Sequence, residues 1–280
     1  HLPEGYNGLG TRNLIYMLLQ LESYHKIYRS QITRPSAHLI FIEEPEAHLH
    51  PQMQEVFINQ LNVAIQKLSS AYPAEDVWNV QFIITTHSSH VANAACFDAV
   101  RYFYNQKDAV KSIRNTKVKD FKKGMQTISV TDKEFLHKYM TLTKCDLYFA
   151  DKVIMVEGTT ERLLMPRLRE LVDKSLPEHQ KLASQYVTCI EAGGAHAHLF
   201  YPLLDFLELK TLVVTDLDSI KKVEKENNKK KKINVWEKCP VAEGTRTCNT
   251  AIRYWFAPKD IKKIEDFHLS PVELSGKSRH

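Results

Sequence analysis

Acidic side chains occur in two pairs in the second half of the sequence, at spacings that could hold divalent cations. Glu157 and Glu161 follow one apolar run, and Asp216 and Asp218 follow another. Four carboxylates brought together repel one another unless cations neutralise them, and ligands that are all oxygen favour Mg²⁺ or Mn²⁺. Two such ions activate water and stabilise a leaving oxygen in phosphodiester cleavage. The pattern therefore predicts a metal centre made of Glu157, Glu161, Asp216 and Asp218.

Either pair alone has a simpler interpretation. An acid that follows a strand is often a cap for the next helix, where it faces the positive end of the helix dipole. The two pairs together are more specific, because each follows an apolar run and a further strand and helix separate them. The sequence is therefore compatible with both interpretations, metal ligands and helix caps.

The elements that must position these acids alternate between two hydrophobic periods. Residues 152–156, 186–190 and 211–215 predict strands, and residues 160–173 and 197–207 predict helices. This order indicates a parallel α/β sheet. Because ligand groups gather beyond the carboxyl ends of parallel strands, we expect both acid pairs at one edge of the sheet.

The first half alternates in the same way. The spacing predicts a helix over 11–30, a buried strand over 39–42, a helix that begins at Pro51, and a second buried strand over 81–85. A third strand is expected over 100–104. The pattern then weakens from about residue 105, where we expect a domain boundary.

Motifs in this first half resemble those of ABC-type ATPases. Four apolar residues followed by Glu43-Glu44-Pro45-Glu46 are similar to a Walker B strand, and Thr85-Thr86-His87-Ser88 is similar to the switch strand. The resemblance implies that Glu43 orients the shell of a magnesium ion, that Glu44 polarises the attacking water, and that His87 senses the terminal phosphate. Gly8 and Gly10, before the first helix, resemble a degenerate signature loop, where backbone amides suit phosphate.

The phosphate-loop pattern G-x-x-x-x-G-K-[S/T] does not occur in these 280 residues. In ABC-type ATPases this loop lies upstream of the signature loop. The resemblance therefore implies that the sequence is the C-terminal part of a longer protein, and that ATP binds only with the upstream phosphate loop.

The second half resembles the Toprim fold of topoisomerases, primases and related nucleases. The matching segments are Val156-Glu157-Gly158-Thr159-Thr160-Glu161 and Thr215-Asp216-Leu217-Asp218, with Gly193-Gly194 between them as a turn before a helix. An ABC-type ATPase tail joined to a Toprim domain is similar to the OLD (overcoming lysogenization defect) family, whose members include the nuclease subunit of the Gabija anti-phage system. The expected domains are 1–105 for the ATPase part, 106–144 for a connecting segment and 145–280 for Toprim.

The family resemblance implies a metal-dependent DNA endonuclease controlled by its ATPase and assembled as a homodimer or larger homo-oligomer. Glu157, Asp216 and Asp218 would be catalytic, and Lys277 is the candidate for the family's additional lysine. A helicase-like or other defence protein is a further expected partner. The alternative hypothesis is a non-cleaving ATPase sensor or scaffold that binds nucleic acid or a partner protein.

The composition sets limits on these hypotheses. Hydrophobic residues make up 43% and charged residues 25%, which is typical of a globular chain, and the longest apolar run is too short for a membrane span. Five cysteines without a C-x-x-C pair indicate reduced thiols and a cytoplasmic protein. Residues 221–232 carry seven lysines and two glutamates, equal to the whole net charge of +5. This stretch predicts a solvated loop or a flexible arm for nucleic-acid phosphates.

Overall fold

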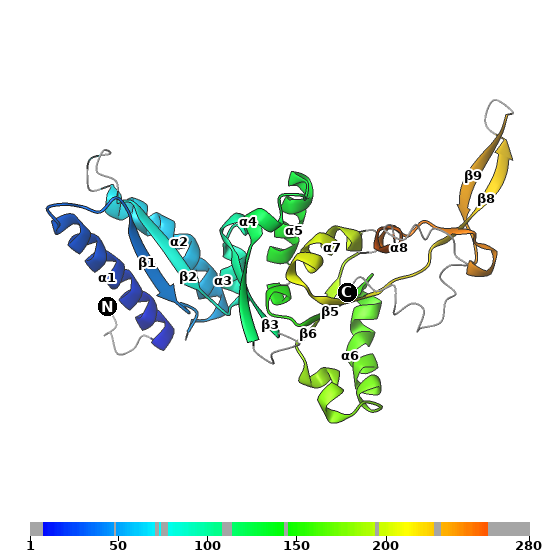
Figure 1. The fold of residues 1–280 in the computed structure, drawn as a ribbon, viewed down its shortest axis with the longest axis horizontal. Helices are drawn as coiled ribbons and strands as arrows, with labels where there is room; N and C mark the ends of the chain where they lie inside the picture. The colour runs from blue at the N-terminus through cyan, green and yellow to red at the C-terminus, as the bar shows by residue number, and fades with distance from the viewer. Residues whose placement is uncertain are drawn as a thin grey trace. The chain divides into compact units, whose positions relative to one another are not determined.

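A computed structural model describes residues 8–47, 49–70, 73, 78–107, 114–142, 145–193, 196–226 and 231–256 (Figure 1). The chain divides into two compact units. The first unit comprises residues 1–126 and 137–148, and the second comprises residues 127–136 and 149–280. Among the described residues, no helix is both long enough and apolar enough to cross a membrane.

The first unit is built on a parallel pair of strands flanked by two long helices. Strand β1 pairs with β2 in parallel, with Glu43 opposite Thr85 at the carboxyl end. Pro51 opens the second helix, where its missing N–H costs no hydrogen bond. The predicted strands and helices of this region are confirmed. Their bounds are α1 (Leu9–Ser30), β1 (His38–Glu43), α2 (Pro51–Ser69) and β2 (Val80–Thr85). A short helix that was not predicted, α3 (Ser89–Ala94), follows β2.

One face of this strand pair carries the core of the unit. Ile40 packs with Phe57 and Leu61 of α2 and with Tyr28 of α1. The apolar run 39–42 was expected to be a buried strand, and this expectation is wrong for Leu39 and Phe41. Side chains alternate between the two faces of a strand, so Phe41 points away from this core and is 69% exposed.

The stretch expected to connect the two domains contains regular structure. The third predicted strand is confirmed as β3 (Arg101–Lys107), but it pairs antiparallel with β4 (Arg114–Asp120) in a separate sheet of two strands. Two helices follow, α4 (Phe121–Gly124) and α5 (Val130–Leu142). The polar sequence of β4 hides its strand character because none of its described side chains is buried: residues 115–118 are exposed and residues 119–120 are half-buried. The boundaries 1–105, 106–144 and 145–280 stay a prediction.

The second unit contains the predicted parallel α/β sheet. Its order is β6-β5-β7, and β5 pairs in parallel with both neighbours. All the predicted strands and helices of this sheet are present. Their bounds are β5 (Lys152–Val156), α6 (Thr159–Asp173), β6 (Val187–Glu191), α7 (Ala197–Leu207) and β7 (Lys210–Val214), and a short helix α8 (Thr250–Phe256) ends the described part.

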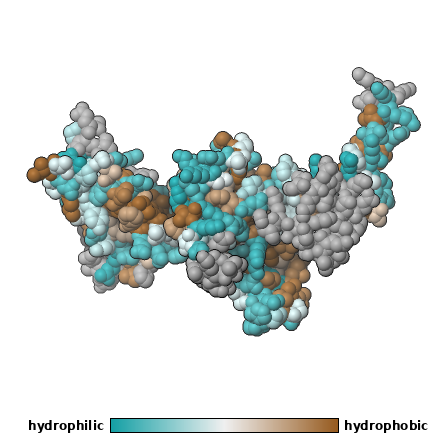
Figure 2. All heavy atoms as spheres, in the orientation of Figure 1, coloured by the Kyte–Doolittle hydropathy of each residue, from teal (hydrophilic) through white to brown (hydrophobic). Residues whose placement is uncertain are grey.

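The two long helices of this unit cover opposite faces of the sheet (Figure 1). Ile154 and Val156 of β5 pack with Met165 of α6. Helix α7 contributes a fully buried Leu203 to the core. By contrast, the leucines of α6 face solvent: Leu163 is 73% exposed, and Figure 2 shows apolar atoms on the surface over this helix.

Residues 221–226 and 232 of the lysine-rich stretch lie in the two strands of an antiparallel hairpin, so the predicted loop or flexible arm is wrong for these residues. Strand β8 (Ser219–Glu226) pairs with β9 (Lys232–Lys238), and a short β10 (Arg246–Thr247) pairs with the start of β8. Residues 227–230 lie outside the described residues. Several lysines are paired across the hairpin, for example Lys225 with Glu237 and Lys232 with Glu224. Opposite charges on facing strands support this ladder.

Truncation of two leucines should separate buried from exposed apolar positions in the second unit. Leu203→Ala should lower the free energy of unfolding by about 2–5 kcal/mol, because it leaves a cavity in the core. The same truncation at the exposed position, Leu163→Ala, should change it by less than about 0.5 kcal/mol. Denaturant unfolding of the two variants provides the measurement, and equal losses would contradict the assigned packing.

Candidate active site at the carboxyl ends of β5 and β7

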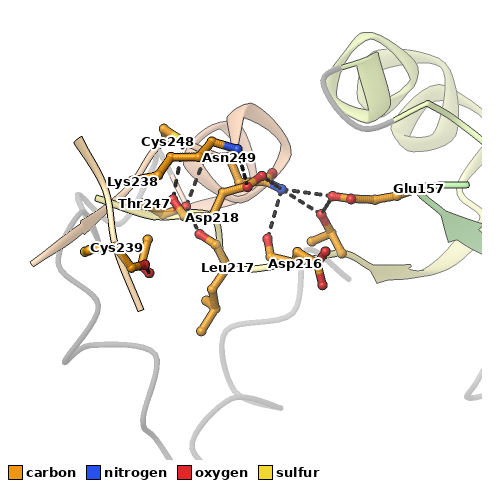
Figure 3. A network of polar contacts seen from close by, with 11 residues as sticks. Glu157, Asp216, Leu217, Asp218, Lys238, Cys239, Thr247, Cys248 and Asn249 are labelled. Atoms are coloured by element: carbon orange, nitrogen blue, oxygen red, sulfur yellow. Dashed lines mark hydrogen bonds and ion pairs between the residues drawn. The ribbon is translucent and has the colours of Figure 1, made fainter. Parts of the chain in front are cut away.

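In-register pairing brings the two acid-bearing strand ends together. Val156 lies opposite Val214, so the chain leaves β5 and β7 at the same edge of the sheet. The first residues beyond these ends make contact, since the Thr215 hydroxyl donates a hydrogen bond to Glu157 Oε1 (Figure 3). The expectation that both acid pairs emerge at one edge is therefore confirmed.

A buried asparagine joins the two strand ends. Asn249 is 4% exposed, and its Nδ2 lies 2.7 Å from Thr215 Oγ1, 3.0 Å from Glu157 Oε1 and 3.0 Å from the main-chain oxygen of Asp216. Asp218 Oδ2 is also within reach, at the longer distance of 3.5 Å (Figure 3). One amide nitrogen thus contacts oxygens from both acid pairs. No role was predicted for this asparagine from the sequence.

The loop that carries the two aspartates is held by the strand that follows the hairpin. Asp218 has a φ of 46°, in the left-handed region that aspartate tolerates better than most residues. Its carbonyl accepts the Cys248 N–H at 3.0 Å, and the Thr247 hydroxyl donates to the Leu217 carbonyl. Both hydrogen bonds are accepted by main-chain carbonyls of the loop, so they stabilise it independently of the acidic side chains.

The hairpin places a cation on the same aspartate. Lys238, at the end of β9, has its Nζ 3.1 Å from Asp218 Oδ1. The hydrogen bond to Asp218 and then the charge of this carboxylate raise the pKa of the Lys238 ammonium. Because the lysine side chain is 78% exposed, water and salt screen this pair. Lys238 lies outside the lysine-rich stretch 221–232, and no role was predicted for it.

The remaining predicted metal ligands take part differently. Glu161 turns back to the start of its own helix, where its Oε2 accepts the Gly158 N–H at 3.0 Å. This contact corresponds to the capping interpretation. Asp216 contributes its main-chain oxygen, and no hydrogen bond from a described residue reaches its carboxylate. Among the described residues, no three His, Cys, Asp or Glu side chains are grouped closely enough to hold a metal ion.

The donor chemistry nevertheless fits a hard divalent cation. Carboxylates of Glu157, Asp216 and Asp218 lie at one sheet edge, and hard cations prefer such oxygen ligands. Glu157 and Asp218 share contact with one amide nitrogen, so their contacting oxygens lie no farther apart than the sum of the two hydrogen-bond distances. Gly193, in the turn before α7, has the left-handed φ of 64° that favours glycine. Gly194 and Lys277 lie outside the described residues.

The first unit brings its predicted nucleotide residues to one strand edge as well. Glu43 ends β1, and the next N–H, that of Glu44, donates to the Thr85 carbonyl at 3.0 Å. His87 Nε2 lies 3.3 Å from Glu44 Oε1, and both side chains are exposed. The arrangement therefore joins the two predicted motifs through their own side chains.

A third acid of this loop was not predicted to have a role. Glu46 Oε1 accepts the His87 N–H at 2.6 Å, and this hydrogen bond fixes the backbone of the histidine. Ser88 caps α3 through its side chain and donates to Gln54 Oε1 at 2.5 Å. The acid repeat 43–46 was the only sequence signal for Glu46.

The predicted signature-loop glycines lie at the start of the first helix. Gly8 is the residue before α1, and Gly10 lies within its first turn. Asn13 Nδ2 donates to the Ala47 carbonyl at 3.3 Å, which links this helix start to the loop after β1.

Comparison with known families accounts for both units. Residues 1–92 match the model of an AAA ATPase domain, and residues 148–218 match the model of an overcoming lysogenization defect protein-like TOPRIM domain. The fold and the strand-end acids thus define a chain in which an AAA ATPase domain precedes a TOPRIM domain. The chain belongs to the OLD family. ATPase and TOPRIM domains generally use ATP and divalent metals.

Two curated relatives support this assignment. Endonuclease GajA of Bacillus cereus (strain HuB5-5) is 33% identical over 240 residues, covering 82% of this chain and 33% of the relative. Old nuclease of Escherichia phage P2 is 28% identical over 227 residues, covering 77% of this chain and 34% of the relative. The chain spans about a third of the length of these relatives.

Removal of the lysine charge at Asp218 should strengthen divalent cation binding. Lys238→Gln removes a cation that competes for the same carboxylate, so the Kd for Mn²⁺ should fall roughly two- to fivefold, as is typical of an exposed ion pair. The effect should shrink at high salt, because salt screens exposed charges. Isothermal titration provides the measurement.

The control for this variant lies on the same hairpin. Lys232→Gln removes an exposed lysine that pairs with Glu224 and not with Asp218. This variant should bind Mn²⁺ as the unmodified chain does. Equal changes in both variants would point to a general charge effect and contradict the specific role of Lys238.

Proposed function

We propose that this chain is the ATPase–TOPRIM part of a metal-dependent DNA endonuclease that nicks or cleaves phosphodiester bonds. The observation that carries the proposal is the convergence of Glu157 and Asp218 on one buried amide at the carboxyl edge of the TOPRIM sheet. The two relatives, an endonuclease and a nuclease, support the same class of activity.

The proposed catalytic residues are the acids at the two strand ends. Glu157, Asp216 and Asp218 would hold Mg²⁺ or Mn²⁺ in a two-metal centre, with Glu161 as a further ligand after release of its cap. Bound there, such ions would neutralise charge on the phosphate and lower the pKa of attacking water. Lys277 remains the proposed additional lysine of the centre.

Electrostatics supports DNA as the substrate. A backbone phosphate that approaches three carboxylates is repelled unless positive charge is supplied nearby. Lys238 already lies against Asp218, and further lysines line the same hairpin. These cations can contact phosphates on either side of the scissile bond, so affinity should fall as salt rises.

The ATPase part is proposed to control assembly or access to the nuclease. Glu43 would orient the magnesium shell, Glu44 would polarise water, and His87 would sense the terminal phosphate. Contact between Glu44 and His87 supports a shared site. Gly8 and Gly10 would present helix-start amides to phosphate, and ATP would bind only with an upstream phosphate loop.

The assembly and setting belong to the same proposal. We infer a homodimer or larger homo-oligomer, because its signature and phosphate loops would come from different subunits. We also infer that this assembly is cytoplasmic and acts in anti-phage defence. A helicase-like or other defence protein is the proposed further partner.

A second candidate function is a non-cleaving ATPase sensor or scaffold that binds nucleic acid or a partner protein. The observation that favours it is the orientation of Glu161, which caps α6 and does not join the other acids. In this alternative the acids would shape a binding surface, and divalent cations would not lead to cleavage.

Plasmid cleavage separates the two candidates. Asp216→Ala should lower the rate of nicking in Mg²⁺ or Mn²⁺ by at least about 100-fold, because it removes a proposed ligand from the reacting centre. Asp151→Ala is the matched control, since this exposed acid lies before β5, at the opposite end of the strand. Nicking that survives Asp216→Ala would contradict the assigned centre.

Hydrolysis of ATP tests the first unit. In a longer protein that includes the upstream phosphate loop, Glu44→Gln should abolish hydrolysis, because an amide cannot polarise water as a carboxylate does. Glu55→Gln, at an exposed position of α2, is the control that should retain hydrolysis. Phosphate release measures the rate, and a Glu44→Gln rate equal to that of the control would remove the assignment.

A further inference from the structure

We propose that Asn249 is a positioning residue that holds Glu157 against the Asp216–Asp218 loop for cation binding. This inference rests on the proposed function and deepens it. Its basis is the set of contacts of one amide with both strand ends, through Glu157 Oε1 and Asp218 Oδ2 (Figure 3).

The orientation of the amide is determined by the helix that follows. The Ile252 N–H donates to Asn249 Oδ1 at 3.2 Å, in the arrangement of a helix N-cap. The reversed amide would place its NH₂ group against this N–H, so Nδ2 must face the acids. Asn249 is therefore a donor toward the site and an acceptor toward α8.

The helix itself is anchored in the core of the unit. Ala251 is almost fully buried, and its carbonyl accepts the Tyr201 hydroxyl of α7 at 3.1 Å. The Asn249 N–H donates to Thr247 Oγ1 at 3.0 Å, which joins the residue to β10 as well. The backbone of Asn249 is thus held by Thr247 and its side-chain oxygen by Ile252. A side chain held in this way can position the carboxylates that it contacts.

The chemistry of an amide suits this position. Two carboxylates at one sheet edge repel each other, and an N–H donor shared between them offsets part of this repulsion without adding a competing charge. Asn249 reaches Glu157 directly and also through the Thr215 hydroxyl, which accepts from Nδ2 and donates to Glu157. Each carboxylate keeps a second oxygen that the amide does not use, Glu157 Oε2 and Asp218 Oδ1.

Serine at this position separates the two roles of the asparagine. Serine caps helices about as well as asparagine but is too short to bridge the carboxylates. Partners that orient metal ligands typically contribute 10- to 100-fold to metal affinity. The Kd of the 280-residue chain for Mn²⁺ should therefore rise about 10-fold or more in Asn249→Ser, while its thermal unfolding midpoint stays near that of the unmodified chain.

The matched control is the same substitution on the exposed hairpin. Asn234→Ser should leave both the Mn²⁺ affinity and the unfolding midpoint unchanged. A Kd for Asn249→Ser within twofold of the control would overturn the proposal and leave Asn249 as a helix cap only. If Asn249→Ser does not fold, Asn249→Thr tests the same bridge, because threonine also caps helices but lacks the amide that reaches the two carboxylates. A Kd for Asn249→Thr within twofold of the control would then overturn the proposal.

Cleavage assays on the same samples distinguish this inference from the proposed function. A chain that binds Mn²⁺ but does not cleave DNA would contradict the nuclease, while the affinity ratio would still decide the role of Asn249. Absence of Mn²⁺ binding by the unmodified chain would overturn both proposals. Weakened binding together with slower cleavage at limiting Mn²⁺, restored at high Mn²⁺, is the result that supports both.

Discussion

Repulsion between carboxylates at one sheet edge is the constraint on which the TOPRIM unit depends. Parallel pairing of β5 with β7 forces Glu157 and the two aspartates to the same edge, whatever their charges. Neutral hydrogen-bond donors and one exposed cation offset this repulsion. Asn249 and Thr215 donate to Glu157, and Lys238 pairs with Asp218. The local network is thus a consequence of the strand order.

Much of this fold could be predicted from the sequence because its strands are short apolar runs that end in acids. The order β5, α6, β6, α7, β7 follows from the alternation of two hydrophobic periods, and its parallel topology follows from that order. The hairpin could not be predicted in this way. Charged side chains dominate β8 and β9, and a solvated ladder stabilised by cross-strand pairs has no apolar pattern to detect.

The acids of the candidate site could be predicted from the sequence, but the hydrogen bonds that join them to distant residues could not. Glu157, Asp216 and Asp218 stand out because each follows a strand. Asn249 lies more than 30 residues farther along the chain, in a segment for which no strand or helix was predicted. Long-range contacts of this kind depend on tertiary packing, as does the choice of Glu161 between capping α6 and facing the other acids.

Both strands of the β8–β9 hairpin adjoin Asp218 at the base of the hairpin. Strand β8 begins at the residue after Asp218, and β9 ends at Lys238, whose ammonium pairs with that aspartate. The base of the hairpin and the acidic edge therefore share one residue, because the aspartate that precedes β8 is also the ion-pair partner of the lysine that ends β9. A change in the length or register of the hairpin would alter the surroundings of this carboxylate without any change in the core of the parallel sheet.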